Sequence, residues 1–222
     1  MSTVFSSPAL PRVLPFALYI AFLAMNSVIP EGAMDTRWLY PLRVGVVALA
    51  LAVFWRQYDE LRGRAGMAGG FWAVSLIVGM VVFVLWVNLG ASWMVLGEAG
   101  KGFDPRDGGV INPVLAASRV AGAALVVPVM EELFWRSFVM RWIDNPRFRE
   151  VLPTAVSLKA LLLSSLVFGF EHHEWFAGVI AGLAYGWLYR FTGCLWAPVV
   201  AHGVTNALLG LWVLYAGAWH FW

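Results

Sequence analysis

The chain is poor in charged residues, and this shortage excludes a water-soluble domain. Only 13% of its 222 residues are charged and 61% are hydrophobic, whereas a soluble domain carries about 25% charged residues. The apolar residues gather in runs of about 18–25, the length that a helix needs to cross about 30 Å of hydrocarbon. Many of the thirteen tryptophans stand near the ends of these runs, where an amphipathic ring suits the headgroup region. The sequence therefore predicts an integral membrane protein.

Two further shortages narrow the chemistry. The single cysteine, Cys194, excludes an internal disulfide and a thiolate metal cluster. A formal net charge of only +2 gives no basis for a nucleic-acid partner. Arg12 precedes an apolar stretch as in a signal peptide, but that stretch ends at Asn26 and Pro30 without a small-residue cleavage site, so we expect a retained first span.

The predicted fold is an all-α, polytopic transmembrane helical bundle, because the apolar runs are continuous and do not alternate as barrel strands do. We expect a single integral membrane domain over residues 1–222 with about seven spans. The predicted spans are 13–30, 38–56, 71–96, 113–142, 155–172, 175–191 and 195–219. Lys and Arg are more frequent in the links that lie on the cytoplasmic side when the N-terminus is inside. An odd number of spans then places the C-terminus outside, and this orientation depends on the short link between the fifth and sixth spans.

The fourth span carries charges that are costly in hydrocarbon and therefore informative. Glu132 and Arg136 are four residues apart, which puts them about 40° apart on one helical face in the favourable order. Glu131 lies about 140° from Arg136 by the same geometry, so it has no partner in its own helix. The alternative is a buried ion cluster that serves packing alone.

Two other spans bring imidazoles. His172 follows Phe168 by four residues, and His202 precedes Asn206 by four, so each pair shares a helical face. A carboxylate and an imidazole can together deprotonate a water, and a second histidine with an amide can donate to an oxyanion. We therefore expect the fourth, fifth and seventh spans to converge on one polar cavity. We expect Glu171, His173, Glu174 and His220 to be solvated.

These residues form three motifs that together resemble a known family. Glu-Glu-x-x-x-Arg at 131–136, Phe-x-x-x-His at 168–172 and His-x-x-x-Asn at 202–206 resemble the CAAX-processing and bacteriocin-processing glutamic intramembrane proteases, which include the type II CAAX prenyl endopeptidases. The lead into the last motif, Gly193-Cys194-Leu195-Trp196-Ala197-Pro198, is similar as well. The resemblance covers a motif-bearing core of about 113–210.

The resemblance implies a hydrolase that cleaves a peptide bond of a membrane-associated protein without metal or other cofactor. It implies that Glu131 and His172 activate water, that His202 and Asn206 form the oxyanion hole, and that Glu132 and Arg136 support them. Because His173 follows His172 directly, a one-residue change of helix phase would exchange their roles, and the phase set by Phe168 favours His172. The implied partners are membrane lipid and a peptide or protein substrate, in a bacterial inner membrane. The N-terminal half resembles exosortase-associated proteins, which suggests a link to protein sorting.

Several other functions stay open at this stage. Glu131, His172 and His202 are also a possible ligand set for a metal-dependent protease, although the two-histidine helical zinc motif is absent because residue 177 is alanine. Cys194 with Arg190 and His202 suggests a cysteine transpeptidase, but eight helical residues rise about 12 Å, which is too far for proton transfer. A non-catalytic binding or immunity protein is a third alternative. A serine mechanism at Ser164 or Ser165 is disfavoured, because neither serine has the Gly-x-Ser-Gly context.

Overall fold

The computed structural model of the chain describes residues 7–30, 32–62, 70–98 and 102–222, and it is almost entirely helical. Its α-helices are α1 (Leu10–Val28), α2 (Leu39–Val53), α3 (Asp59–Arg62), α4 (Gly70–Asn88), α5 (Pro113–Ala121), α6 (Val127–Glu132), α7 (Met140–Asp144), α8 (Leu158–Phe170), α9 (Trp175–Thr192) and α10 (Trp196–Ala216). Two π-helical stretches, η5 (Gly122–Val126) and η6 (Leu133–Val139), join α5, α6 and α7 into one continuous helix.

Short elements complete the described chain. The 3₁₀ turns are η1 (Thr36–Trp38), η2 (Trp55–Gln57), η4 (Ser92–Met94), η7 (Phe148–Glu150), η8 (Pro153–Ala155) and η9 (Trp219–Phe221). The strands β1 (Arg106–Asp107) and β2 (Val110–Ile111) form an antiparallel hairpin in which Arg106 pairs with Ile111. The predicted all-α bundle is thus confirmed.

Local sequence sets the helix ends. Asn112 caps the long helix, and its side-chain oxygen accepts hydrogen bonds from the backbone N–H groups of Val114 and Leu115 at 3.0 and 3.2 Å. Pro113 occupies the first turn, where its missing N–H costs nothing. Helices α9 and α10 end at Gly193 and Gly217, whose φ angles of 68° and 66° lie in the left-handed region that glycine tolerates.

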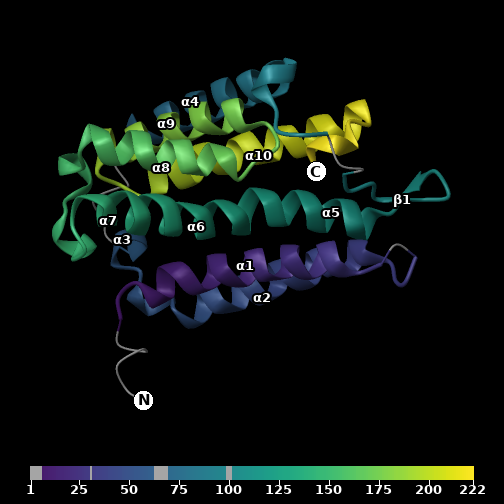
Figure 1. The fold of residues 1–222 in the computed structure, drawn as a ribbon, viewed down its shortest axis with the longest axis horizontal. Helices are drawn as coiled ribbons and strands as arrows, with labels where there is room; N and C mark the ends of the chain where they lie inside the picture. Colours follow the sequence, from purple (N-terminus) through teal and green to yellow (C-terminus); the bar gives the residue numbers. More distant parts are fainter. Residues whose placement is uncertain (1–6, 31, 63–69, 99–101) are drawn as a thin grey trace.

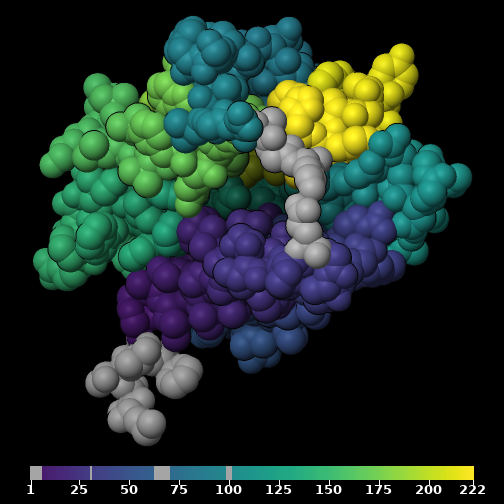
Figure 2. All heavy atoms as spheres, turned by 45° about the vertical axis from the view of Figure 1, so that its right-hand side comes forward, coloured from purple at the N-terminus to yellow at the C-terminus, as the bar shows by residue number. Residues whose placement is uncertain are grey.

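The helices form two groups, one on each side of the long central helix (Figure 1). α1 and α2 pack together on one side of it, and α4, α8, α9 and α10 lie on the other. α10 also packs along α4 and α9, so it is enclosed by neighbours. The space-filling view in Figure 2 shows a hollow between the purple N-terminal pair and the yellow C-terminal segment.

Five of the described helical segments are long and apolar enough to cross a membrane, which supports a multi-pass protein. They are Leu10–Val28, Thr36–Val53, Phe71–Asn88, Pro113–Asp144 and Trp196–Ala216. The fifth and sixth predicted spans are also helices, but α8 has only 13 residues, and α9 is less apolar because it carries glycines, tyrosines and Arg190. The predicted bundle is therefore present, but two of its seven predicted spans, α8 and α9, do not meet the length and hydropathy expected of a membrane-crossing helix.

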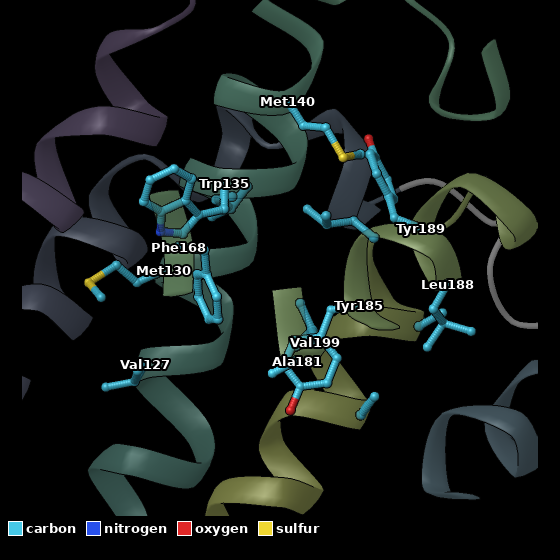
Figure 3. Packing of buried hydrophobic residues seen from close by; sticks show 14 of the residues in the cluster. Val127, Met130, Trp135, Met140, Phe168, Ala181, Tyr185, Leu188, Tyr189 and Val199 are labelled. Atoms are coloured by element: carbon cyan, nitrogen blue, oxygen red, sulfur yellow. The ribbon is translucent and has the colours of Figure 1, made fainter. Parts of the chain in front are cut away.

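The helices on the far side of the central helix pack closely because glycines line one contact. A Cβ placed on Gly182 would lie 2.9 Å from the Cα of Ser165, and one on Gly178 would lie 2.9 Å from the Cα of Gly169. The backbones of α8 and α9 therefore approach directly. Figure 3 shows large side chains such as Trp135, Phe168 and Tyr185 filling the space between these helices and the central one.

Candidate active site

The central helix brings both glutamates into the protein interior. Glu131 and Glu132 end α6, and their side chains are 8% and 0% exposed. The following residues, including Arg136, form the π-helical stretch η6. Short π segments inside α-helices are frequent at functional sites. The predicted ion pair between Glu132 and Arg136 is confirmed within this π-helical geometry, since Nε of Arg136 lies 3.0 Å from Oε2 of Glu132.

Glu132 has a second partner from α10. Its Oε1 lies 2.9 Å from Nδ1 of His202. A carboxylate only accepts, so Nδ1 carries the proton and donates it to Glu132. Glu132 thus links Arg136 to His202 across two helices, and its low exposure is consistent with two charge-assisted contacts.

His202 is held between an aromatic ring and Glu131. The ring of Tyr185 stacks on the imidazole at 5.0 Å with an interplanar angle of 17°. Tyr185 is itself fixed by its hydroxyl, which donates to Oγ1 of Thr205 at 2.7 Å. The free nitrogen of His202, Nε2, lies 3.9 Å from Oε2 of Glu131. This imidazole therefore has a fixed plane and a fixed tautomer.

His172 approaches from the turn after α8. Its Nδ1 lies 2.9 Å from the carbonyl oxygen of Phe168. Because a carbonyl only accepts, Nδ1 is the protonated nitrogen, and the neutral ring presents the Nε2 lone pair as an acceptor. The edge-on ring of Trp86, at 5.2 Å, packs against this imidazole.

Glu131, His172, His202 and Asn206 line one cavity of about 190 Å³ between the central helix, α8, α9 and α10. Oε2 of Glu131 is buried there without a hydrogen-bond partner among the described residues. Nδ2 of Asn206 donates one hydrogen bond, 2.9 Å long, to the carbonyl oxygen of Ala123 in η5. The second N–H of the Asn206 amide does not take part in that hydrogen bond. The convergence of the three motif helices on one polar cavity is therefore observed.

Of the charged and imidazole neighbours of His172, only Glu174 lies at the cavity. Glu174, expected to be solvated, lines the same cavity. Glu171 is exposed, as expected, and its Oε2 also accepts a hydrogen bond from Nε1 of Trp135 at 3.1 Å. His173 points elsewhere, and its Nδ1 donates to the carbonyl oxygen of Leu96 at 2.6 Å.

Other candidates from the sequence lie away from this cavity. Cys194 is buried in the link between α9 and α10, and Ser164 and Ser165 are buried within α8. Within residues 7–30, 32–62, 70–98 and 102–222, no three His, Cys, Asp or Glu side chains are grouped so as to hold a metal ion. What the cavity offers is a carboxylate oxygen without a hydrogen-bond partner, the Nε2 atoms of two imidazoles and an amide donor, which together suit hydrolysis.

Sequence reasoning missed the aromatic residues that position these groups. Tyr185 and Trp135 carry no motif signature, and their contacts join residues that are far apart in the chain. Arg136 also lies over the rings of Phe168, at 4.6 Å, and Tyr185, at 5.6 Å. A cation over aromatic faces loses less on burial than one among aliphatic groups, which helps to hold this arginine beside Glu132.

The comparison with protein families gives one finding. The model described as "Type II CAAX prenyl endopeptidase Rce1-like" matches residues 113–208. The matched segment runs from the start of the central helix into α10 and includes all seven residues of the three motifs. No curated protein matches the chain, and no solved structure does.

Proposed function

From the premise that residues 113–208 carry the sequence of the type II CAAX prenyl endopeptidase Rce1-like family, we propose that this protein is a metal-independent intramembrane glutamic endopeptidase. Its substrate is a membrane-associated peptide or protein. The observation that carries the proposal is the single cavity into which Glu131, His172, His202 and Asn206 all project. We place the protein in a bacterial inner membrane.

In the proposed reaction, Glu131 and His172 share the activation of one water. The buried Oε2 of Glu131 has no hydrogen-bond partner among the described residues, and the Nε2 lone pair of His172 is free to accept. The water oxygen attacks the peptide carbonyl carbon while its proton passes to this pair. The C–N bond then breaks, and the same proton is returned to the leaving amine nitrogen.

His202 and Asn206 are proposed to stabilise the oxyanion. With both glutamates ionised, Arg136 balances one negative charge and a protonated His202 balances the other. A protonated imidazole bonded to Glu132 through Nδ1 has its Nε2–H left for the oxyanion. The second N–H of Asn206 is the other donor, and Glu132 and Arg136 act by positioning His202.

The test is turnover by the purified protein in lipid nanodiscs, after exhaustive chelation, on a peptide identified by comparing membrane-protein termini with and without the protein. We expect wild type to be active, Glu131→Gln to be inactive and His172→Ala to be severely impaired. His173→Ala is the matched control and should keep near-wild-type turnover, because its imidazole contacts the Leu96 carbonyl outside the cavity. Full activity of Glu131→Gln, or activity that returns only with added zinc, would show that the proposal is wrong.

A further inference from the structure

A second cavity, of about 290 Å³, lies between α1, α2, α5 and residues 102–103. Tyr19, Arg119 and Trp222 line both this cavity and the one that contains Glu131. The two cavities are therefore neighbours that share a wall.

Two arginines that line the second cavity, Arg43 and Arg119, have no carboxylate partner among the described residues. Arg43 is only 8% exposed, and its guanidinium lies 4.3 Å from the ring of Tyr19 and 4.9 Å from that of Tyr40. Arg119 lies 4.4 Å from the same Tyr40 ring. The Nε atoms of both arginines are buried without a hydrogen-bond partner. Among the described residues, both positive charges therefore contact aromatic faces and no carboxylate.

The other buried arginines of the chain have hydrogen-bond or ion-pair partners. Arg141 donates to the carbonyl oxygens of Val151 and Arg149 at 2.8 and 3.2 Å. Arg12 forms an ion pair with Glu60 at 2.6 Å, and Arg136 forms one with Glu132 at 3.0 Å. Even Arg37, at the rim of the second cavity, is paired with two aspartates. Burial of an unpaired charge is costly, and cation–π contacts offset only part of that cost. Two buried guanidinium groups that face one cavity are therefore suited to binding an anion.

We propose that Arg43 and Arg119 bind a carboxylate of the substrate peptide, and this inference rests on the proposed function. Twelve residues separate Arg119 from Glu131 on the central helix, a rise of about 18 Å. An extended peptide covers that distance in about five residues. Because Arg119 lines both cavities, a peptide cleaved at Glu131 can place a carboxylate between the two guanidinium groups. A planar guanidinium matches a carboxylate in bidentate geometry.

The carboxylate can be the C-terminus of the peptide or an acidic side chain, and peptide variants distinguish these sources. For a peptide that wild type cleaves, we would measure kcat and KM for the free acid, for its C-terminal amide, and for forms with acidic side chains changed to amides. Loss of the recognised carboxylate should raise KM about 10-fold to 100-fold, as expected for a charge-assisted hydrogen bond, with kcat nearly unchanged. Arg43→Gln and Arg119→Gln should raise KM for the acidic peptide to the value for the neutral one and leave the neutral peptide unaffected.

Arg147→Gln is the control, since that side chain is 77% exposed and paired only with Glu150. Arg43→Lys should retain part of the effect. Equal KM values for the acidic and neutral peptides would overturn the inference. An equal rise in KM for both peptides in the arginine variants would overturn it as well. In either case, cleavage of the neutral peptide would still support the proposed protease. Arginine-dependent stimulation by phosphatidylglycerol without any carboxylate effect would also overturn it, in favour of a lipid phosphate. Arginine-dependent binding of the acidic peptide to Glu131→Gln in a preparation without turnover would support the site although the proposed reaction had failed.

Discussion

Glu131 and Glu132 are adjacent in sequence, yet their surroundings assign them different tasks. Glu132 is fully buried, forms an ion pair with Arg136 and accepts a hydrogen bond from His202. Glu131 faces the cavity, and its Oε2 has no hydrogen-bond partner in the described chain. The Glu132–Arg136 pair was predictable because its spacing is local. The contact with His202 was not, because it joins residues 70 positions apart on different helices.

Arg136→Ala is expected to destabilise the protein as well as inactivate it. Breaking a buried ion pair from one side costs roughly 3–5 kcal/mol, and here the loss leaves Glu132 with one fewer cation. Arg147→Ala is the matched control, because its pair with Glu150 is exposed and such pairs contribute about 0–1 kcal/mol. Denaturation in mixed micelles measures the free energy of unfolding of both variants. An equal loss of stability in the two variants would contradict the supporting role of Arg136.

Asn206→Ala is expected to lower kcat by about 10²–10³-fold, as for a removed oxyanion donor. Asn88→Ala provides the comparison, because Asn88 also donates from Nδ2 to a helix carbonyl, at 2.7 Å, but is exposed on α4. Its kcat should equal that of wild type. A loss of less than about 3-fold in Asn206→Ala, within the context-dependence of such measurements, would remove this amide from the proposed oxyanion hole.

At the scale of elements, the sequence predicted where helices begin and end better than how they bend. Asn112-Pro113 and Gly193 mark helix ends through local chemistry that is visible in the sequence. The π-helical stretches η5 and η6 have no such signature, because they depend on how the central helix packs against its neighbours. The close approach of α8 and α9 was predictable from the glycine spacing, although its partner residue Ser165 was not.

Gly182→Ala is expected to lower stability and activity together. The new Cβ would lie 2.9 Å from the Cα of Ser165, so α8 and α9 must separate, and His172 moves with the end of α8. The contrasting variant is Gly45→Ala in the middle of α2, where a Cβ meets nothing within 4 Å. That change should leave stability equal or raise it by about 0.5–1 kcal/mol, the helical cost of glycine relative to alanine. Thermal denaturation in detergent compares the stability of the Gly182→Ala and Gly45→Ala variants. Equal stability of the two variants would argue against direct backbone contact between α8 and α9.

At the scale of the whole molecule, the charged links lie at opposite ends of the bundle. One end carries Arg12 paired with Glu60 and Arg149 paired with Asp59. The other carries Arg37, which pairs with Asp35 and Asp107 beside the β-hairpin. Figure 1 places the start of α1 at one end and the end of α10 at the other, as an odd number of passes requires. The positive-inside rule then favours the Arg12 end as cytoplasmic.

This orientation predicts which residues a membrane-impermeant thiol reagent reaches. The single cysteine, Cys194, is buried, so a Cys194→Ser background allows one new cysteine to report its own side of the membrane. Val110→Cys precedes the central helix at a residue that is 74% exposed, and Arg147→Cys follows the helix at a side chain that is 77% exposed. In sealed right-side-out vesicles, we expect the reagent to label Val110→Cys at once and Arg147→Cys only after permeabilisation. The reverse pattern would place the N-terminus outside, and labelling of both cysteines before permeabilisation would show that the central helix does not cross the membrane.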